Sequence, residues 1–277
     1  MLLRGSSLFS CWQFCVSSGS RFSRSADKQA ADYDGRALVV RALERATWNE
    51  GQDFKARYRS LMTREVRRFD GDGHVEDEDL GDYKVLPIDA APFERRLTLN
   101  GRPLSEEEQE GKRRREAEFR EELRRSRAAT DDAEKEEDDD EIAFNDELIW
   151  RFVFTVEAEE PLRGRPSYCI SFRPRHGRLP IRRRIDYALN KARGQIWIDQ
   201  ETFDAARIEF ELIDKVRLWG GVLGTISYAR GSFDRGPVLG DIWAQLQFET
   251  YTDIRAFLSR TRRAELSQWR EFVRVEE

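Results

Sequence analysis

The sequence predicts an α+β fold: a strongly curved antiparallel sheet, or half-open β-barrel, covered by a few helices. The first observation is the period-two alternation of apolar and polar residues in most segments after Phe54, which is typical of strands with one buried face. The second is the scarcity of helical segments, without the regular strand–helix alternation of a parallel α/β fold. The third is a hairpin over Gly194–Asp214, which we expect at the centre of the sheet.

The composition separates a folded part of the chain from a solvated part. Of 277 residues, 39% are hydrophobic and 36% are charged, and the net charge is -5 because acidic and basic blocks cancel. This balance disfavours a nucleic-acid-binding protein. Three cysteines (Cys11, Cys15 and Cys169) and two histidines (His74 and His176) offer neither a disulfide framework nor zinc-ligand spacing. We therefore expect no metal and no cofactor.

Residues 1–33 form a leader that is similar to a poor secretory signal. Arg4 precedes a modestly apolar run over Leu8–Val16, and small residues follow. Leu8-Phe9-Ser10-Cys11 is also a loose match to a bacterial lipoprotein cleavage box, which would attach a lipid at Cys11. A disordered leader or a misassigned start codon is the alternative. The leader predicts a periplasmic or envelope location, and residues 34–277 are then expected to form a single curved-sheet domain.

One helix and three strands are expected before residue 105. Apolar residues recur at helical spacing over Asp34–Asn49, with Asp34 as the N-cap. From Phe54 the period changes to two, which predicts a long strand. The turn Asp70-Gly71-Asp72-Gly73 connects it to a returning strand over His74–Leu86. A third strand is expected over Phe93–Leu99.

The turn after Phe69 also has the DxDxG pattern of a calcium loop. An EF-hand loop requires a bidentate glutamate at its twelfth position, and position twelve from Asp70 is Gly81. The pattern therefore predicts a hairpin turn rather than a calcium site.

A charged helix and an acidic run form an insertion over Ser105–Glu141. Ser105 and Glu108 have the spacing of a capping box, and the helix that follows has few large apolar residues. Asp131–Glu141 is nearly all acidic and is expected to be disordered. The insertion is either a solvated arm between strands or a docking arm for a basic partner.

Two strands, a basic loop and a short helix follow the insertion. Phe152–Val156 and Tyr168–Phe172 are the strands, with Cys169 on the opposite face of the second as inert filler. The loop Arg173–Arg184 precedes a helix over Ile185–Lys191. Its arginines could contact an anionic membrane, pair internally or bind a nucleic-acid backbone. The residues predicted to contact anions or a membrane are Arg175, Arg178, Arg182, Arg183 and Arg184.

The chain beyond the hairpin is expected to add an apolar lip and the last strands of the sheet. Leu218–Gly224 is apolar and rich in glycine, and it lacks the Lys-Ser/Thr of a nucleotide P-loop. The strands are expected over Thr225–Phe233, Asp241–Tyr251, Ile254–Leu258 and Arg263–Val275.

Two sets of motifs resemble known families. Phe69-Asp70-Gly71-Asp72-Gly73, Tyr83-Lys84-Val85-Leu86 and Asn100-Gly101-Arg102-Pro103-Leu104-Ser105-Glu106-Glu107 are similar to a group of uncharacterised exported bacterial proteins. Arg193-Gly194-Gln195-Ile196-Trp197-Ile198-Asp199, followed by Ala206-Arg207-Ile208-Glu209, resembles the central hairpin of LolA-like outer-membrane lipoprotein-sorting carriers. The resemblance covers the chain from about Asp34. It implies an open barrel with a hydrophobic cavity, export across the inner membrane and the carrying of acyl chains.

The leading hypothesis is a non-enzymatic envelope protein that binds a lipid or a lipoprotein acyl chain in an apolar cavity. The partners would be a lipid or an acylated protein, with transient contact to an anionic membrane and no nucleic acid. The second hypothesis is a protein-interaction or sensing module that uses the arm 105–141, and the third is a hydrolase that uses Asp199 and Asp204. The candidate ligand contacts, each of which could instead be core packing, are Tyr58, Met62, Phe152, Phe154, Phe172, Phe210, Leu246 and Phe248.

Overall fold

The computed structural model describes residues 33–277 except 53, 130–145, 219–223, 257–258 and 276–277. The predicted acidic run, most of the apolar lip and all but the last residue of the leader therefore lie outside the described residues. The described helices are α1 (Gly35–Glu50), α2 (Phe54–Arg57), α3 (Glu106–Ala129), α4 (Asp146–Arg151) and α5 (Asp186–Leu189). The described strands are β1 (Tyr58–Phe69), β2 (Val75–Ile88), β3 (Ala91–Arg96), β4 (Thr98–Leu99), β5 (Arg102–Pro103), β6 (Phe152–Leu162), β7 (Arg165–Pro174), β8 (Ala192–Asp199), β9 (Ala205–Leu212), β10 (Val216–Leu218), β11 (Gly224–Leu239), β12 (Ile242–Ala256) and β13 (Ser259–Arg274).

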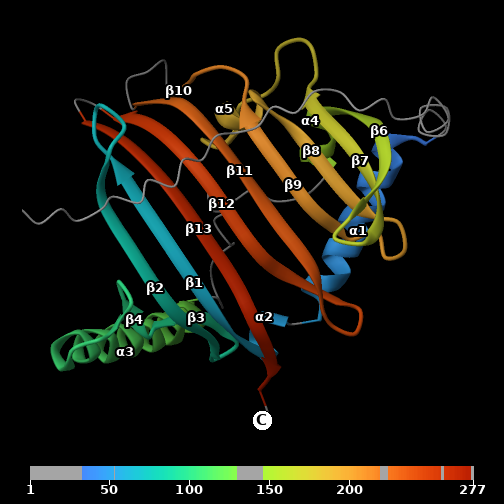
Figure 1. The fold of residues 1–277 in the computed structure, drawn as a ribbon. Coiled ribbons are helices and arrows are strands. Elements are labelled where there is room, and N and C mark those ends of the chain that lie inside the picture. The colour runs from blue at the N-terminus through green and yellow to red at the C-terminus, as the bar shows by residue number, and fades with distance from the viewer. Residues whose placement is uncertain (1–32, 53, 130–145, 219–223, 257–258, 276–277) are drawn as a thin grey trace, which may run out of the picture.

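In the described residues, the larger sheet has eleven strands, and its paired neighbours run antiparallel. The strand order is β3-β2-β1-β13-β12-β11-β9-β8-β7-β6, and β10 pairs with β11 beside this path. Strands β4 and β5 form a separate two-stranded sheet. Figure 1 shows that the larger sheet is strongly curved and that its outer strands, β3 and β6, do not meet. The predicted α+β fold, an open curved antiparallel sheet with few helices, is confirmed.

The C-terminal strand β13 joins the two parts of the sheet. It pairs with β1 along one edge and with β12 along the other. Strands β1, β2 and β3, which come early in the chain, therefore reach the rest of the sheet only through β13. The expectation of a strand rather than a helix over Arg263–Val275 is confirmed by this 16-residue strand.

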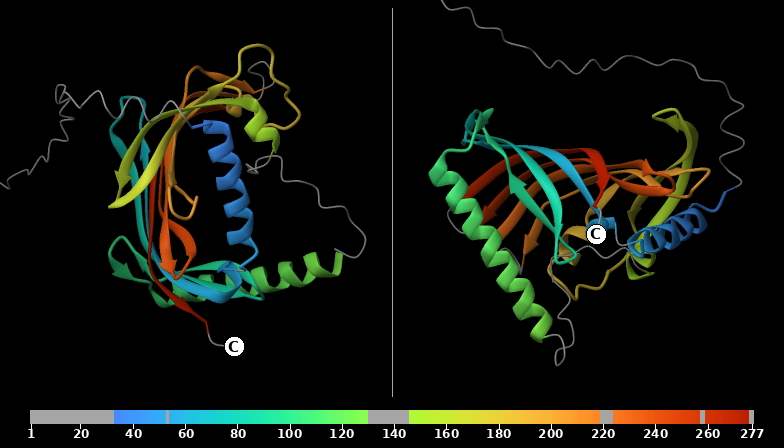
Figure 2. Two further views of the ribbon diagram at one scale, coloured as in Figure 1. Left: turned by 90° about the vertical axis from the view of Figure 1, so that its right-hand side faces the viewer. Right: turned by 90° about the horizontal axis from the view of Figure 1, so that it is seen from below.

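Helix α1 begins where the sequence predicts and covers one end of the sheet. The Asp34 carboxylate accepts a hydrogen bond from the Arg36 amide at 2.9 Å, as an N-cap residue does. Leu38, Val39 and Ala42 are buried against the β6–β8 end of the sheet. Figure 2 shows α1 at this end and α3 towards the opposite end, near β3.

Several predicted boundaries are wrong. The strand expected over Phe93–Leu99 is divided into β3 and β4, which belong to different sheets. The strand expected from Phe54 begins at Tyr58, because Phe54–Arg57 forms a helical turn that stacks the Phe54 ring on Tyr58, with centroids 4.7 Å apart. Ile254–Leu258 is not a separate strand, because β12 continues to Ala256 in an unbroken ladder with β13. The helix expected over Ile185–Lys191 is the shorter α5.

The hairpin over Gly194–Asp214 forms as β8 and β9, but it does not lie at the centre of the sheet. The middle of the strand order falls at β12 and β11, and the hairpin lies nearer to β6. It lies instead in the centre of the hydrophobic core, where Ile196 and Ile198 are buried with residues of α1. Strand β8 is thus one of the most deeply buried strands although it is not central in the strand order.

Helix α3 begins with the predicted capping box and packs on the edge strand β3. The Ser105 amide donates to Glu108 Oε2 at 2.7 Å, and the Glu108 amide donates to Ser105 Oγ at 3.3 Å. Phe119 of α3 packs against Phe93 of β3, with ring centroids 5.1 Å apart. The charged helix is thus attached to the sheet by one of its few apolar residues.

A buried polar cluster fixes the C-terminal end of α1 to the sheet. Asp204, in the β8–β9 loop, accepts hydrogen bonds from Asn49 Nδ2 at 2.5 Å and from Arg45 Nε at 2.8 Å. Asn49 Oδ1 in turn accepts from the Trp243 amide of β12 at 3.2 Å. The cluster therefore connects α1, the hairpin loop and β12 through side chains that are shielded from water.

Replacing Asp204 with alanine is expected to lower the free energy of unfolding by about 3 kcal/mol, because the change leaves buried donors of Asn49 and Arg45 without their acceptor. Urea unfolding followed by circular dichroism measures it. The matched control is Glu211→Ala, which removes the exposed Arg193–Glu211 pair of the same hairpin and should cost less than about 0.5 kcal/mol. Equal losses in the two variants would contradict a structural role for the buried cluster.

Candidate functional site

One face of the large sheet carries a continuous apolar row across six strands. We call this the inner face, because α1 covers part of it. Residues of the row are direct cross-strand neighbours, and such pairs lie within side-chain contact. The apolar row consists of Val156, Ile170, Ile196, Ile208, Phe233 and Phe248, from β6, β7, β8, β9, β11 and β12.

Helix α1 covers only the first part of the apolar row. Ile170 is 0% exposed and Ile196 is 4% exposed, and both belong to the cluster that contains the apolar side chains of α1. Phe152 and Phe172 pack edge to face in the same cluster, with centroids 5.2 Å apart. Side chains therefore fill the space between α1 and the sheet.

Beyond α1 the apolar row continues as partly exposed aromatic rings. The Phe233 centroid lies 4.9 Å from that of Phe248 and 6.0 Å from that of Phe210. The Phe210 ring lies over Gly231, where a Cβ atom would come within 2.8 Å of ring carbons. A glycine at this position lets the ring lie close to the sheet, and the result is a flat aromatic surface next to the core.

The apolar row ends in a charged cluster. The next cross-strand neighbours of Phe248 are Ser267 of β13 and then Arg64 of β1. Arg64 forms ion pairs with Glu94 at 2.8 Å and with Glu265 at 3.3 Å. The inner face therefore offers an apolar surface next to α1 and a polar, fully paired surface at its far end.

The structure places the predicted ligand contacts in several different environments. Phe152, Phe154, Phe172, Phe210 and Phe248 lie on the inner face, the first three next to α1 and the last two further along the sheet. Met62 is buried on β1 at the far end of the same face, beside Arg64. Tyr58 stacks on Phe54, and Leu246 is at a bulge over Gly236.

Leu246 is not on the same face as Phe248, contrary to the alternation of the sequence. A register shift between Asp234 and Arg235 leaves Leu246 without a cross-strand partner, and its side chain lies over Gly236 near Arg163. Sequence reasoning also omitted Phe233. It lies at the end of a predicted strand, and only the cross-strand register identifies it as the link between Ile208 and Phe248.

The predicted anion-contact arginines lie in the loop between β7 and α5. The buried Asp186 holds this loop: its Oδ2 accepts from the amides of Arg182 and Arg183 at 2.8 and 3.1 Å, and its Oδ1 is 3.0 Å from the Arg151 guanidinium. Burial alone would raise the pKa of Asp186. The hydrogen bonds from these two amides help to lower it below its usual value. Arg178, Arg182 and Arg184 are exposed, whereas Arg175 and Arg183 are partly buried.

The two carboxylates considered for hydrolysis have structural partners. The Asp199 carboxylate accepts two hydrogen bonds from the Arg165 guanidinium, at 2.6 and 2.9 Å. Its Oδ1 also accepts a hydrogen bond from the Thr202 amide at 2.9 Å. Burial would raise the pKa of Asp199, but the hydrogen bonds from Arg165 and Thr202 outweigh it and hold the pKa below its usual value. Asp204 is held by α1. Both carboxylates serve the hairpin turn that connects β8 and β9.

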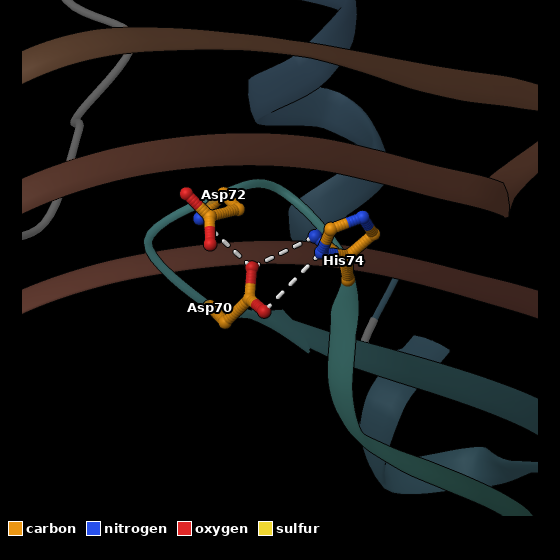
Figure 3. Close-up of side chains that lie close together, drawn as sticks. All are labelled: Asp70, Asp72 and His74. Carbon is orange, nitrogen blue, oxygen red and sulfur yellow. Dashed lines mark hydrogen bonds and ion pairs between the residues drawn. The ribbon is translucent and has the colours of Figure 1, made fainter.

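The turn at Asp70 has the predicted form of a hairpin turn. Asp70 Oδ1 accepts from the amides of Asp72 and His74 at 2.9 and 2.8 Å, as Figure 3 shows. The hydrogen bond from the His74 amide lowers the pKa of Asp70. Arg262 of β13 donates to the Gly71 carbonyl at 2.9 Å and fixes the turn to the sheet. The closeness of the three side chains thus follows from the turn itself.

Cys169 is buried on β7, and burial raises the pKa of its thiol to about 12. The thiol is therefore protonated at neutral pH, as expected of a packing residue. Among the described helices, none combines the length and the apolar character that crossing a membrane requires.

Several solved structures are similar to this chain at low identity. A LolA superfamily protein from Nitrosomonas europaea shares 11% identity at a TM-score of 0.33, over 88% of this chain and 94% of that one. A putative outer membrane lipoprotein-sorting protein domain from Vibrio parahaemolyticus shares 12% identity at a TM-score of 0.30, over 86% of this chain and 95% of that one. The MucA/MucB complex structure from Pseudomonas aeruginosa shares 10% identity at a TM-score of 0.25, over 88% of this chain and 100% of that one. The matched structures include the LolA group that the Gly194–Asp214 hairpin resembles. No family model and no curated protein sequence matches the chain.

Replacing Asp199 with asparagine is expected to lower the free energy of unfolding by roughly 2 kcal/mol at pH 7, because Arg165 loses a charged acceptor. A carboxylate with a lowered folded-state pKa stabilises the protein above its unfolded pKa, and this contribution disappears as the pH falls through the folded-state pKa. The difference between wild type and variant should therefore shrink below about pH 4. Urea unfolding at several pH values measures it.

Glu201→Gln provides the control, since Glu201 contacts the same guanidinium at 2.9 Å but is largely exposed. Its effect should stay below about 0.5 kcal/mol at every pH. A difference for Asp199→Asn that does not change with pH would show that the charge of Asp199 is not what stabilises the turn.

Proposed function

We propose that this protein is a non-enzymatic binding protein of the cell envelope, which holds an acyl chain of a lipid or lipoprotein against its inner face. The observation that carries the proposal is the partial exposure of Phe233 and Phe248, which continue the buried part of the apolar row beyond α1. An apolar surface in continuity with the core stays exposed at a cost in free energy, and covering it with a hydrocarbon chain removes that cost.

The dimensions of the surface suit a linear apolar ligand. Neighbouring strands are separated by about 4.8 Å, so the row from β9 through β11 to β12 extends over about 10 Å. Each buried methylene contributes about 0.8 kcal/mol, and flat aromatic rings offer contact area without a deep cavity. A chain along the row would begin beside α1 and end near Ser267 and Arg64.

The polar cluster at the end of the row would receive the head of the ligand. Arg64 is partly exposed and would lie beside an ester or amide carbonyl of the ligand, while Glu94 and Glu265 keep it in place. Ser267 is buried and bonded to Arg64 and Glu265, so it supports the cluster rather than contacting the ligand. Such a surface matches a molecule with an apolar chain and a polar end. It lacks the free acid and base that hydrolysis of that molecule would need.

We also propose that the loop between β7 and α5 touches an anionic membrane during transfer. Its exposed arginines lie next to Ile181, and Ile213 follows β9 near the same rim; each isoleucine is 50% exposed. Figure 1 shows this loop, α5 and β10 along one rim of the sheet. Exposed apolar side chains among cations are typical of surfaces that bind at the headgroup level of a bilayer.

The double variant Phe233→Gln, Phe248→Gln should carry at least fivefold less lipid than wild type after purification, because it places amides on the proposed binding surface. Mass spectrometry of extracted lipid measures the difference. The matched control is Tyr228→Gln, Tyr251→Gln, a pair from the same two strands on the opposite face, with ring centroids 5.9 Å apart. Wild-type protein that carries no lipid and takes none from vesicles would overturn the proposal.

Replacing Arg178, Arg182 and Arg184 with glutamine should weaken binding to phosphatidylglycerol vesicles by about tenfold or more, since each cation near an anionic surface contributes to attraction. Co-sedimentation measures it, with phosphatidylcholine vesicles as the neutral reference.

The charge-matched control is the triple replacement of Arg113, Arg124 and Arg125 on α3 by glutamine, which should leave vesicle binding within about twofold of wild type. A similar loss in both triple variants would indicate an effect of net charge and would contradict the assignment to the loop.

A further inference from the structure

A hollow of about 500 Å³ lies between α3 and the β3–β4 edge of the structure, far from the inner-face aromatic surface. Its floor includes Leu99 and Leu104, and Leu104 is 9% exposed. Gly111 of α3 lines it from above, and a Cβ atom at Gly111 would meet nothing within 4 Å. This volume lies within the range of small-molecule sites.

Three cations around the hollow form no ion pair within the part of the chain that the structure describes. They are Lys112, Arg114 and Arg115, which lie in one turn of α3. The other arginines of the same helix behave differently: Arg120 pairs with Glu116 at 3.1 Å, and Arg125 pairs with Glu121 at 3.4 Å. The unpaired cations therefore gather where the hollow lies.

The carboxylates at the hollow do not neutralise these cations. Glu108 is engaged by the two terminal nitrogens of Arg102 at 2.8 Å each, and this contact lowers the pKa of Glu108 to about 2. Glu118 also lines the hollow, but it is exposed and forms no ion pair among the described residues. Positive charge is therefore in excess on this surface.

Arg96 adds a fixed cation to the wall. Asp79 and the Thr98 carbonyl hold its guanidinium, the latter at 2.8 Å. Burial is the main cause that lowers the pKa of Lys112, and the nearby charges of Arg115 and Arg96 lower it further. Geometry and electrostatics thus agree that the hollow favours an anion.

We propose that this hollow is a binding site for a phosphate group, with Lys112 and Arg115 on the phosphate oxygens and Leu99 and Leu104 beneath the organic part of the ligand. A guanidinium matches two phosphate oxygens with parallel hydrogen bonds, and an ammonium contributes a compact charge beside it. The site is independent of the acyl-chain surface, since no residue of the apolar row lines it.

The test is calorimetric titration of the full chain with inorganic phosphate and with dihexanoyl phosphatidate, each at low salt. Saturable binding of either probe is expected. Equal affinities would identify free phosphate as the ligand, and tighter binding of phosphatidate would identify a lipid headgroup. Dihexanoyl phosphatidylcholine, whose phosphate is masked by choline, should bind at least tenfold more weakly than phosphatidate.

Lys112→Gln, Arg115→Gln should weaken the binding of both probes at least tenfold, because it removes two charge-assisted contacts. Arg124→Gln, Arg125→Gln makes the same charge change on the same helix outside the hollow and should stay within twofold of wild type.

A second variant places an apolar side chain in the hollow without removing charge. Gly111→Leu meets no neighbour at Cβ and favours the helix, so the protein should remain folded by circular dichroism while phosphate binding falls at least tenfold. Phe233→Gln, Phe248→Gln should leave phosphate binding unchanged, which separates this site from the acyl-chain proposal. The assignment is overturned if neither probe binds saturably. It is also overturned if the Lys112→Gln, Arg115→Gln variant and its Arg124→Gln, Arg125→Gln control lose binding equally.

Discussion

The arrangement of the inner face depends on the hydrogen bonds between Asn49 and its partners. Asn49 donates to Asp204 and accepts from the Trp243 amide, so one side chain fixes the end of α1 to the hairpin loop and to β12. A helix held only by apolar contacts could slide along the sheet, since such contacts are non-directional. The buried polar cluster gives α1 one position, and that position decides which part of the apolar row is covered.

A single face of the sheet therefore contains both part of the core and the proposed binding surface. Under α1, Ile170 and Ile196 are part of the core that stabilises the fold. Two and three strands further along, Phe233 and Phe248 continue the same row, but they are partly exposed and do not belong to the cluster that contains the apolar side chains of α1. The boundary between the core and the proposed binding surface is set by the length and placement of one helix rather than by a change in residue type.

Local features of this fold were predictable from the sequence, and features that depend on distant partners were not. The Asp34 N-cap, the Ser105–Glu108 capping box and the turn at Asp70 each involve residues within a few positions of one another, and all three form as predicted. The curved antiparallel sheet follows from alternation, which is also local.

The candidate site depended on cross-strand register, which the alternation alone does not determine. Phe233 belongs to the apolar row because it pairs with both Ile208 and Phe248, and Leu246 leaves that face because of a bulge opposite Asp234 and Arg235. The structural role of Asp204 depends on Asn49, which is 155 residues away in the chain. Neither relation has a signal within a short window of sequence.

The place of β13 in the sheet has a consequence for the order in which the protein can form. Strands β1, β2 and β3 are made first during synthesis, but their connection to the remaining strands is the last strand of the chain. The edge of β1 that pairs with β13 would thus lack its partner until β13 has been made, and contacts between segments far apart in a chain form slowly. Joining of the two parts of the sheet is therefore a late step of folding, because it requires β13 to pair with β1 and β12.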